Sequence, residues 1–270
     1  MTLAAAVLLG IIQGLTEFLP VSSSAHLILA RAFFGWEMPP ELGLAFDVAL
    51  HLGTLAAILL FFRQEVAAMA ASLPALFSRD PGAPGWLLRR IAVGTIPVVI
   101  VGLLFSDYIE HVLRTPVVAG GALTVGALGM FAAERLRSRE RTEASMGWTD
   151  AILIGCAQAS ALIPGISRSG ATITVGMFLG MRRDAAARFT FLLAIPAMTA
   201  AAAKEALELA KLEVPVGSLQ LFAVGTIVSA VVGYLTIKYF LRFLAGNKLD
   251  VFAYYRLALA AATVVWMFTR

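Results

Sequence analysis

The sequence contains few charged residues for its length. Only 14% of its 270 residues are Asp, Glu, Lys or Arg, whereas 60% are hydrophobic. A soluble domain of this size carries about a quarter charged residues and close to half apolar ones. The low charge therefore argues against a water-soluble domain and predicts a polytopic membrane protein.

Cysteine and basic clusters are also scarce. Cys156 is the only cysteine, so no intrachain disulfide is possible and packing must hold the fold together. The net charge of +4 is not gathered into a basic cluster interleaved with aromatic residues, which argues against a nucleic-acid partner. The N-terminus lacks a charged segment and a cleavage site, so we expect no removable signal peptide.

Apolar stretches account for most of the chain. Six of them approach the roughly 20 residues that a spanning helix needs, namely 44–62, 90–106, 114–133, 185–203, 217–241 and 250–269. Four others are too short and flank two polar interruptions in pairs, namely 2–12 with 23–34 and 150–157 with 171–181. Non-helical backbone at membrane depth is tolerated only where it is buried in protein or lines a wet cavity. The pattern predicts an all-α polytopic membrane protein with six transmembrane helices and two re-entrant helix-loop-helix segments.

The two polar interruptions resemble each other. Residues 13–26 read QGLTEFLPVSSSAH, and residues 158–172 read QASALIPGISRSGAT. Their glutamines are 145 positions apart (158 − 13 = 145), and three predicted spans follow each run. A re-entrant pair returns to its own side whereas three spans cross, so the second half must be inverted. We predict one integral membrane domain, 1–270, with residues 1–133 and 147–270 as inverted repeats.

Lysine and arginine are unevenly divided between the two sets of loops. One set holds Arg63, Arg79, Arg89, Arg90, Arg135, Arg137, Arg139, Arg141, Arg182, Arg183, Arg242 and Lys248. The other holds only Arg31, Arg114, Lys204, Lys211 and Arg270. Because positive loops stay in the cytoplasm, we expect both termini outside, the first re-entrant loop entering from outside and the second from the cytoplasm.

The first polar run offers an acid, hydroxyls and an imidazole. Gln13 and Glu17 are four apart and share one helix face. Three roles are open for Glu17: ligand of a divalent cation, base, or ion-pair partner of Arg168. Ser23 beside His26 suggests an activated oxygen nucleophile, although serines after a proline also cap helices and a lone histidine is often a packing residue.

The second polar run suggests an anion site. Gly165, Ser167, Arg168 and Ser169 place flexible backbone N–H groups, hydroxyls and a guanidinium at the start of a helix, with Thr172 on its first turn. Helix N-termini bind anions, and the planar fork of Arg matches phosphate oxygens. We therefore predict phosphate binding here, with an ion pair to the first loop as the structural alternative.

Two further features have no assigned chemistry. Asp47 and His51 are one helical turn apart, which predicts a local pair whose role stays open. Residues 65–78 have the composition of an interfacial, partly helical segment.

Both polar runs resemble the signatures of a known family. The first is similar to a signature in which an acidic or amide residue is followed by three further residues and a Glu, and then by a serine-rich turn and a His. The second is similar to the signature Pro-Gly-x-Ser-Arg-Ser-x-x-Thr. Together they resemble the undecaprenyl-diphosphatase, or bacitracin-resistance, family, and the resemblance covers essentially the whole chain.

The resemblance implies a phosphatase of the bacterial cytoplasmic membrane. It would hydrolyse undecaprenyl diphosphate to the monophosphate, recycle this lipid carrier for cell-wall synthesis and confer bacitracin resistance. Family members depend on a divalent cation. By position, Glu17, Ser23, His26 and Arg168 would be the central residues, supported by Gln13, Ser167, Ser169 and Thr172. Where the family allows Glu or Gln, Gln13 leaves Glu17 as the only motif carboxylate.

These residues suggest a mechanism on the periplasmic face. Arg168 and the amides around it would bind the phosphates, and Mg²⁺ or Ca²⁺ would be held by Glu17 and Gln13. Ser23, activated by His26, would attack to form a phosphoserine, with direct attack by water as the alternative. The substrate, a polyprenyl diphosphate, would enter sideways from the bilayer.

Other function classes remain possible from the sequence alone. A transporter or flippase of a phosphorylated lipid or another anion would also use inverted repeats with broken helices. An intramembrane serine protease needs Ser and His but not a phosphate-type loop. The sequence leaves open the metal, the attacking group and whether the chain forms a homodimer.

Overall fold

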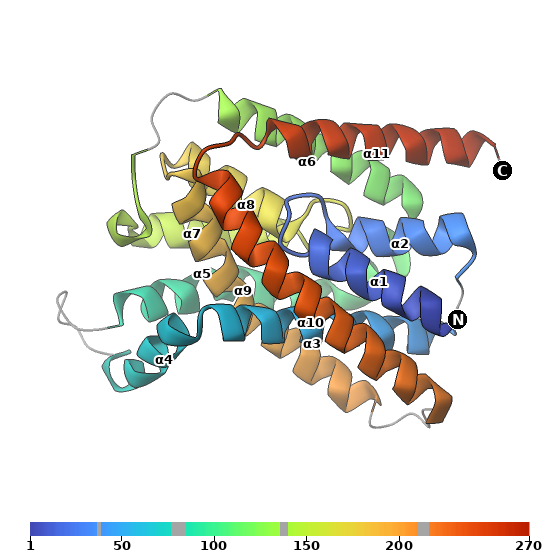
Figure 1. The fold of residues 1–270 in the computed structure, drawn as a ribbon. Helices are drawn as coiled ribbons and strands as arrows, with labels where there is room; N and C mark the ends of the chain where they lie inside the picture. The colour runs from blue at the N-terminus through green and yellow to red at the C-terminus, as the bar shows by residue number, and fades with distance from the viewer. Residues whose placement is uncertain (37–38, 77–84, 136–139, 210–215, 270) are drawn as a thin grey trace.

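The protein is helical throughout the part of the chain that the structure describes. The computed structural model describes residues 1–36, 39–76, 85–135, 140–209 and 216–269, and within these ranges it contains α-helices, short helical turns and no β-strand. Figure 1 shows the long helices running roughly side by side. The predicted all-α class is confirmed.

Within the described ranges, six helices are long and apolar enough to cross a membrane, as predicted. They are α3 (Pro40–Phe61), α5 (Trp86–Tyr108, continued by the π-helical turn η2, Ile109–Leu113), α6 (Pro116–Glu134), α9 (Arg183–Leu209), α10 (Val216–Leu244) and α11 (Asp250–Phe268). The expected interfacial segment contains α4 (Arg63–Ala71) and the 3₁₀ turn η1 (Leu73–Ala75), and its last two residues lie outside the described ranges. Of the residues used for the charge count, Arg79, Arg137, Arg139, Lys211 and Arg270 also lie outside them.

Two helix pairs are interrupted where the polar runs lie. The first pair is α1 (Leu3–Thr16) and α2 (Ser23–Phe34), separated by residues 17–22, here called loop 1. The second is α7 (Trp148–Ser160) and α8 (Arg168–Phe178), separated by residues 161–167, here called loop 2. Each helix is too short to span a bilayer of about 30 Å.

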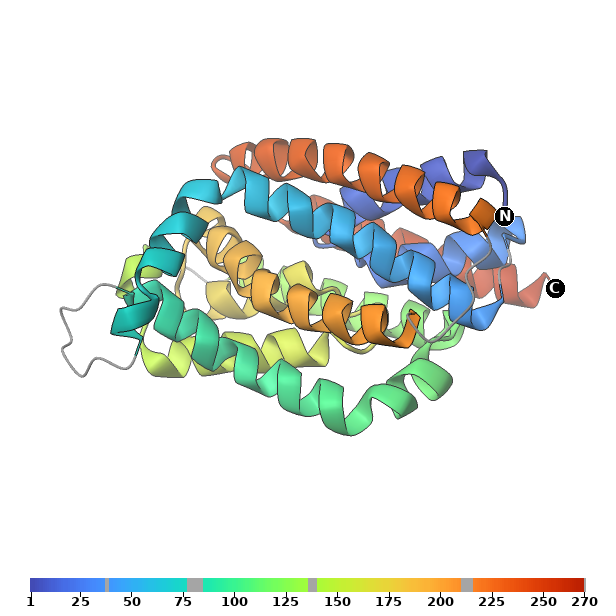
Figure 2. The same cartoon turned by 90° about the horizontal axis from the view of Figure 1, so that it is seen from below.

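The two pairs enter the helix bundle from opposite ends. In Figure 1, α1 and α2 come from the end where both chain termini lie, α7 and α8 come from the other end, and the loops meet in the middle. Figure 2 shows α4 at the end away from the termini. This arrangement is compatible with the predicted inverted repeat and re-entrant segments.

The first helix of each pair packs on a long helix of the other half. A Cβ on Gly10 of α1 would lie 2.9 Å from the carbonyl oxygen of Gly225 in α10, and one on Gly155 of α7 would lie 2.3 Å from that of Gly94 in α5. Gly10 and Gly155 are 145 apart (155 − 10 = 145), the same offset as the polar runs. Small residues allow such close backbone approach, so these glycines interlock the two halves.

Candidate active site

Loop 1 and loop 2 have the same backbone turn. Ser22 and Ser167 are the only non-glycine residues in the described ranges with positive φ, at 74° and 71°, and they are 145 apart (167 − 22 = 145). The Ser22 side chain accepts the backbone N–H of Ala25 at 3.4 Å, and that of Ser167 accepts the N–H of Gly170 at 3.1 Å. Each serine therefore caps the following helix, and strained backbone of this kind concentrates at functional sites.

The capped helices begin with the two residues of highest chemical interest. Ser23 is the first residue of α2, and Arg168 is the first residue of α8. Both helix N-termini, the positive ends of the helix dipoles, therefore point towards the middle of the protein (Figure 1). Two converging positive ends favour a polyanionic ligand there.

Glu17 joins these two residues. Arg168 Nη2 donates to Glu17 Oε1 at 2.5 Å, and Ser23 Oγ donates to Glu17 Oε2 at 2.6 Å. The Glu17 side chain is only 5% exposed, so water screens this ion pair weakly. The alternative of an ion pair between Glu17 and Arg168 is therefore present, and it brings the proposed nucleophile and the proposed phosphate ligand to one carboxylate.

Two further side chains contact the same carboxylate. Gln13 Nε2 donates to Glu17 Oε2 at 3.0 Å, and His51 Nε2 lies 3.4 Å from that oxygen. His51 Nδ1 is 2.7 Å from the carbonyl oxygen of Asp47, which can only accept, so Nδ1 carries a hydrogen. Because the His51 side chain is 33% exposed, it lies on the more open side of the cluster.

Asp47 does not form the side-chain pair with His51 that the spacing suggested. Its carboxylate instead accepts from Arg31 of α2 and from Arg114, which follows η2, each at 2.6 Å. Arginines outcompete a neutral imidazole for a buried carboxylate because they are always charged and bind with two parallel N–H groups. Asp47 thus ties α3 to two other segments.

Both ring nitrogens of His26 contact groups other than the Ser23 hydroxyl, which His26 is predicted to activate. Its Nδ1 is 2.7 Å from the carbonyl oxygen of Ser22, and its Nε2 is 2.7 Å from the Tyr255 hydroxyl. The Tyr255 ring also stacks on the imidazole, with ring centroids 5.6 Å apart. In the described structure, Glu17 and not His26 accepts the hydrogen bond from Ser23.

The hydroxyls of loop 2 and α8 bond mainly to the protein itself. Ser169 Oγ donates to the carbonyl oxygen of Leu19 in loop 1 at 3.0 Å, and Thr172 Oγ1 donates to that of Arg168 at 2.7 Å. Ser167 Oγ lies 3.2 Å from Ser169 Oγ. These groups fix the loops against each other and hold Arg168, and their predicted binding of phosphate stays a prediction.

Gly165 is required by the path of loop 2. Its φ is +103°, and a Cβ there would lie 2.4 Å from the carbonyl oxygen of Ala119 in α6. Only glycine fits a positive φ at so close an approach, so the structure gives Gly165 a packing role.

Several buried polar atoms near the loops have no hydrogen-bond partner among the described residues. They are Arg168 Nη1, Gln13 Oε1 and both amide atoms of Gln158. An unsatisfied buried polar group is costly, and at Arg168 and Gln13, which both contact Glu17, it marks a place where a ligand, ion or water is expected. Arg168 therefore has a second N–H face free for an anion while it holds Glu17.

The residues present could supply only part of the coordination shell of a hard cation. Within the described ranges, no three His, Cys, Asp or Glu side chains are grouped for metal binding. Glu17 and the free Gln13 Oε1 nevertheless place two oxygen donors together. Mg²⁺ commonly takes one or two protein oxygens and completes its shell with substrate phosphates and water, so the donor set fits such an ion.

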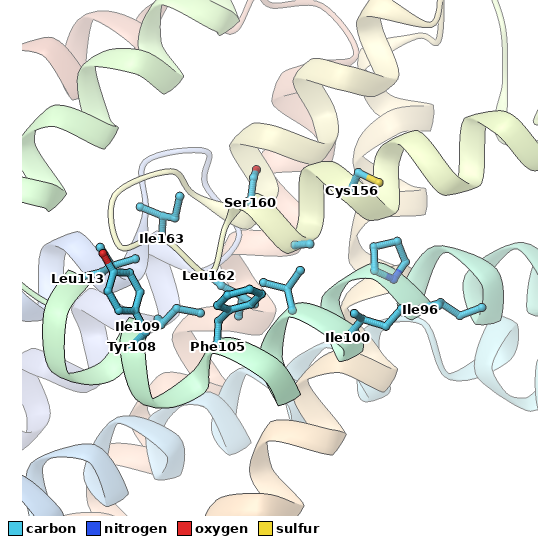
Figure 3. A pocket seen from close by; sticks show the side chains of 13 residues that line it. Ile96, Ile100, Phe105, Tyr108, Ile109, Leu113, Cys156, Ser160, Leu162 and Ile163 are labelled. Atoms are coloured by element: carbon cyan, nitrogen blue, oxygen red, sulfur yellow. The ribbon is translucent and has the colours of Figure 1, made fainter.

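An apolar groove lies beside loop 2 (Figure 3). One wall is formed by α5 and η2, including Phe105 and Tyr108, and the other by α7 and loop 2, including Leu162 and Ile163. Its volume is about 550 Å³. Its mainly apolar lining suits a hydrocarbon chain rather than a polar ligand.

Three residues at the loops were not assigned a role from the sequence. From α11, Tyr255 contacts His26 and Arg256 contacts both loops. From α3, His51 contacts Glu17. Arg256 was visible as a charge inside the predicted span 250–269, which is itself a signal of function. The contacts of Tyr255 and His51 depend on tertiary packing and have no sequence signal.

The comparisons with known proteins all point to the same family. A model of the family described as "Bacitracin resistance protein BacA" matches residues 6–262. An undecaprenyl-diphosphatase of Rubrobacter xylanophilus is 45% identical over 259 residues, covering 95% of each chain. Undecaprenyl-diphosphatase 2 of Stutzerimonas stutzeri is 45% identical over 269 residues and 98% of each chain, and an undecaprenyl-diphosphatase of Alcanivorax borkumensis is 46% identical over 264 residues, 97% of this chain and 98% of its own.

Proposed function

The chain belongs to the bacitracin resistance protein BacA family, and we propose that it hydrolyses undecaprenyl diphosphate to undecaprenyl phosphate and inorganic phosphate. The observation that carries this proposal is the contact of Glu17 with both Ser23 and Arg168. That contact places a hydroxyl, a carboxylate and a guanidinium at two converging helix N-termini. Such a set can bind a diphosphate and deliver a nucleophile to it.

Arg168 is the proposed phosphate ligand. Its Nη1 is buried and has no partner among the described residues, while its Nη2 is held by Glu17, so the guanidinium is pre-oriented before substrate arrives. Pre-oriented donors stabilise the charge that develops on a transferring phosphoryl group without reorganisation. The N-termini of α2 and α8 add their dipoles to the same region.

Ser23 is the proposed nucleophile. Its Oγ attacks the terminal phosphorus, the bond from that phosphorus to the bridging oxygen breaks, and undecaprenyl phosphate leaves. Glu17 Oε2, 2.6 Å from Ser23 Oγ, accepts the hydroxyl proton, and His51 at 3.4 Å is placed to share it. Water then attacks the phosphoserine and releases inorganic phosphate. The hydrogen bond favours Glu17 over His26 as the proton acceptor, and leaves His26 as a residue that shapes the start of α2.

A divalent cation is the proposed cofactor. Glu17 and Gln13 would hold it, with phosphate oxygens and water as the remaining ligands. When bound, Mg²⁺ or Ca²⁺ would neutralise phosphate charge.

The prenyl chain is proposed to lie in the groove between α5 and loop 2. The groove is bordered by Leu162 and Ile163, a few residues before Arg168, so a chain lying there leaves its head group close to loop 2. Its lining is almost wholly apolar, so a prenyl chain can pass from the equally apolar bilayer into the groove without exposing hydrocarbon to polar groups.

We also propose that the head group is processed on the periplasmic face of the bacterial inner membrane. The proposal is supported by the excess of Arg and Lys in the loops at one side and by the position of both termini at the other (Figure 2). Hydrolysis there regenerates the lipid carrier for cell-wall synthesis.

The proposal is tested by measuring phosphate release from undecaprenyl diphosphate by the purified chain, with and without a chelator. We expect release that stops on chelation and returns with Mg²⁺ or Ca²⁺. Acid quenching after mixing with β-labelled substrate should trap label on Ser23. Absence of any release by the folded protein would refute the proposed function, and release without trapped label would favour direct attack by water.

A further inference from the structure

Arg256 is a charged side chain buried inside a spanning helix. It is 0% exposed and lies within α11, which is long and apolar enough to cross a membrane. Among the ion pairs of the described residues, none includes Arg256. A buried cation without a carboxylate is expensive, so other groups must compensate it.

The compensation comes from the backbone of both broken segments. Arg256 Nη1 donates to the carbonyl oxygens of Pro20 in loop 1 at 3.2 Å and Ile166 in loop 2 at 3.0 Å, and Nη2 donates to that of Gly165 at 2.9 Å. One planar guanidinium thus holds both loops at once.

The same side chain is fixed to α6. Its Nε donates to the carbonyl oxygen of Leu123 at 3.1 Å, and Nη2 donates to that of Ala122 at 3.2 Å. Arg256 therefore ties loop 1 and loop 2 to a long helix of the first half through α11 of the second. A lysine has three donors on a single nitrogen and lacks the fork that spans these acceptors.

We propose that Arg256 is a positioning residue, which sets the separation of the two loops so that Ser23 and Arg168 act on the same diphosphate. Pro20 lies three residues before Ser23, and Ile166 lies two residues before Arg168. Displacement of the guanidinium therefore shifts both Ser23 and Arg168. The proposal rests on the proposed function where it names the diphosphate, whereas the positioning of the loops is measured independently of activity.

Two glycines of α6 provide a matched test. A Cβ on Gly126 would lie 1.9 Å from Arg256 Nη2 and 2.6 Å from its Cζ, so Gly126→Ala must displace the guanidinium without removing it. A Cβ on Gly121 would meet nothing within 4 Å. Gly121→Ala adds the same methyl group to the same helix and leaves Arg256 in place.

The experiment compares wild type, Arg256→Lys, Gly126→Ala and Gly121→Ala as purified full-length proteins. Since displacement of catalytic groups by about 1 Å can cost on the order of a hundredfold in rate, we expect kcat for phosphate release to fall about a hundredfold in Arg256→Lys and about tenfold in Gly126→Ala, with smaller changes in KM. Gly121→Ala should stay within about twofold. Hydrogen exchange at residues 17–22 and 161–167 should accelerate in Arg256→Lys and Gly126→Ala but not in Gly121→Ala.

The outcomes separate positioning from simple stability. If Gly126→Ala and Arg256→Lys melt at lower temperature but keep wild-type kcat and loop exchange, Arg256 is only structural and the proposal is overturned. If Arg256→Lys does not fold, Gly126→Ala decides by the same criteria. If wild type itself releases no phosphate, the proposed function fails, and loop exchange alone decides whether Arg256 positions the loops.

Discussion

Loop 1 and loop 2 turn the chain in the same way, at serines 145 residues apart, yet they carry different chemistry. At the first residue of the following helix, loop 1 has Ser23 where loop 2 has Arg168. Loop 1 has the carboxylate of Glu17 where the equivalent position of loop 2 (17 + 145 = 162) is the apolar Leu162. The shared turn therefore acts as a scaffold, and the side chains placed on it give each loop the different part in the reaction that we propose.

The largest effect should come from the carboxylate that only loop 1 has. Glu17→Gln removes the proton acceptor of Ser23 and the partner of Arg168, so we expect kcat to fall by about 10³-fold or more. Steady-state phosphate release measures this. Asp47→Asn is the matched control, because Asp47 is an equally buried carboxylate whose ion pairs among the described residues are with Arg31 and Arg114. It should lower the melting temperature and leave kcat of the folded protein nearly unchanged; equal losses of kcat in both variants would contradict the distinction.

A second effect should come from the cation that only loop 2 has. Arg168→Lys keeps the charge, but its N–H donors all lie on one nitrogen and lack the planar fork that reaches Glu17 with one nitrogen and a phosphate with another, so we expect kcat/KM to fall about a hundredfold. Full activity of Arg168→Lys in the same assay would show that charge alone suffices and that the fork geometry plays no part.

The equivalent glutamines of the two halves extend the comparison of loop 1 with loop 2. Gln13 donates to Glu17, whereas Gln158 has no partner among the described residues. Gln13→Leu should lower kcat about tenfold, since it frees the carboxylate and removes an oxygen donor for a cation. Gln158→Leu should keep activity and raise stability by about 1 kcal/mol, because it removes an unsatisfied buried amide. Similar kinetics for both variants would mean that the two loops are less divided than proposed.

The shared turn predicts equal effects on stability. Ser22→Ala and Ser167→Ala each remove one cap hydrogen bond, so each should lower the free energy of unfolding by about 1 kcal/mol. Thermal or denaturant unfolding in detergent measures this. A difference of more than about 1 kcal/mol between the two variants would show that the caps are not equivalent.

The smallest effect concerns how the half-helices begin outside the membrane interior. α1 is capped by the neutral side chain of Thr2, whereas the first turn of α7 contains Asp150, which accepts the N–H of Gly147 at 2.7 Å and pairs with Arg141 at 2.5 Å. Partial burial opposes ionisation of Asp150, but the hydrogen bonds from Arg141 and Gly147 hold its pKa below its usual value.

A carboxyl group with a lowered pKa stabilises the folded state fully above its ordinary pKa, near 3.9, and this stabilisation is lost as the pH falls through the folded value. Wild type should therefore melt higher than Asp150→Asn at neutral pH, by an amount that shrinks below about pH 4. A difference that is independent of pH would contradict this role.

Most of the fold could be predicted from the sequence because hydrophobic length alone marks the spans. The six spans and the two interrupted pairs follow from the apolar runs, and the glycine-, proline- and serine-rich breaks mark the loops. The meeting of Glu17 with Arg168 could be anticipated as one alternative, since two intramembrane charges of opposite sign favour pairing.

The remaining contacts of the site could not be predicted because they depend on how helices pack. The spacing of Asp47 and His51 suggested a local pair, but arginines from two other segments reach Asp47, and His51 turns to Glu17. His26 precedes Tyr255 by 229 residues, so no local pattern could indicate that its Nε2 contacts that hydroxyl rather than Ser23.

We propose that the two loops form one active site, and the sharpest test of this proposal is a double-mutant cycle between Ser23→Ala and Arg168→Ala. The measurement is kcat/KM for phosphate release by wild type, both single variants and the double variant. Residues that act as a unit show strongly non-additive losses. On this proposal, the double variant should be about as slow as the slower single variant. Losses that multiply would contradict it, because they would mean that Ser23 and Arg168 act independently.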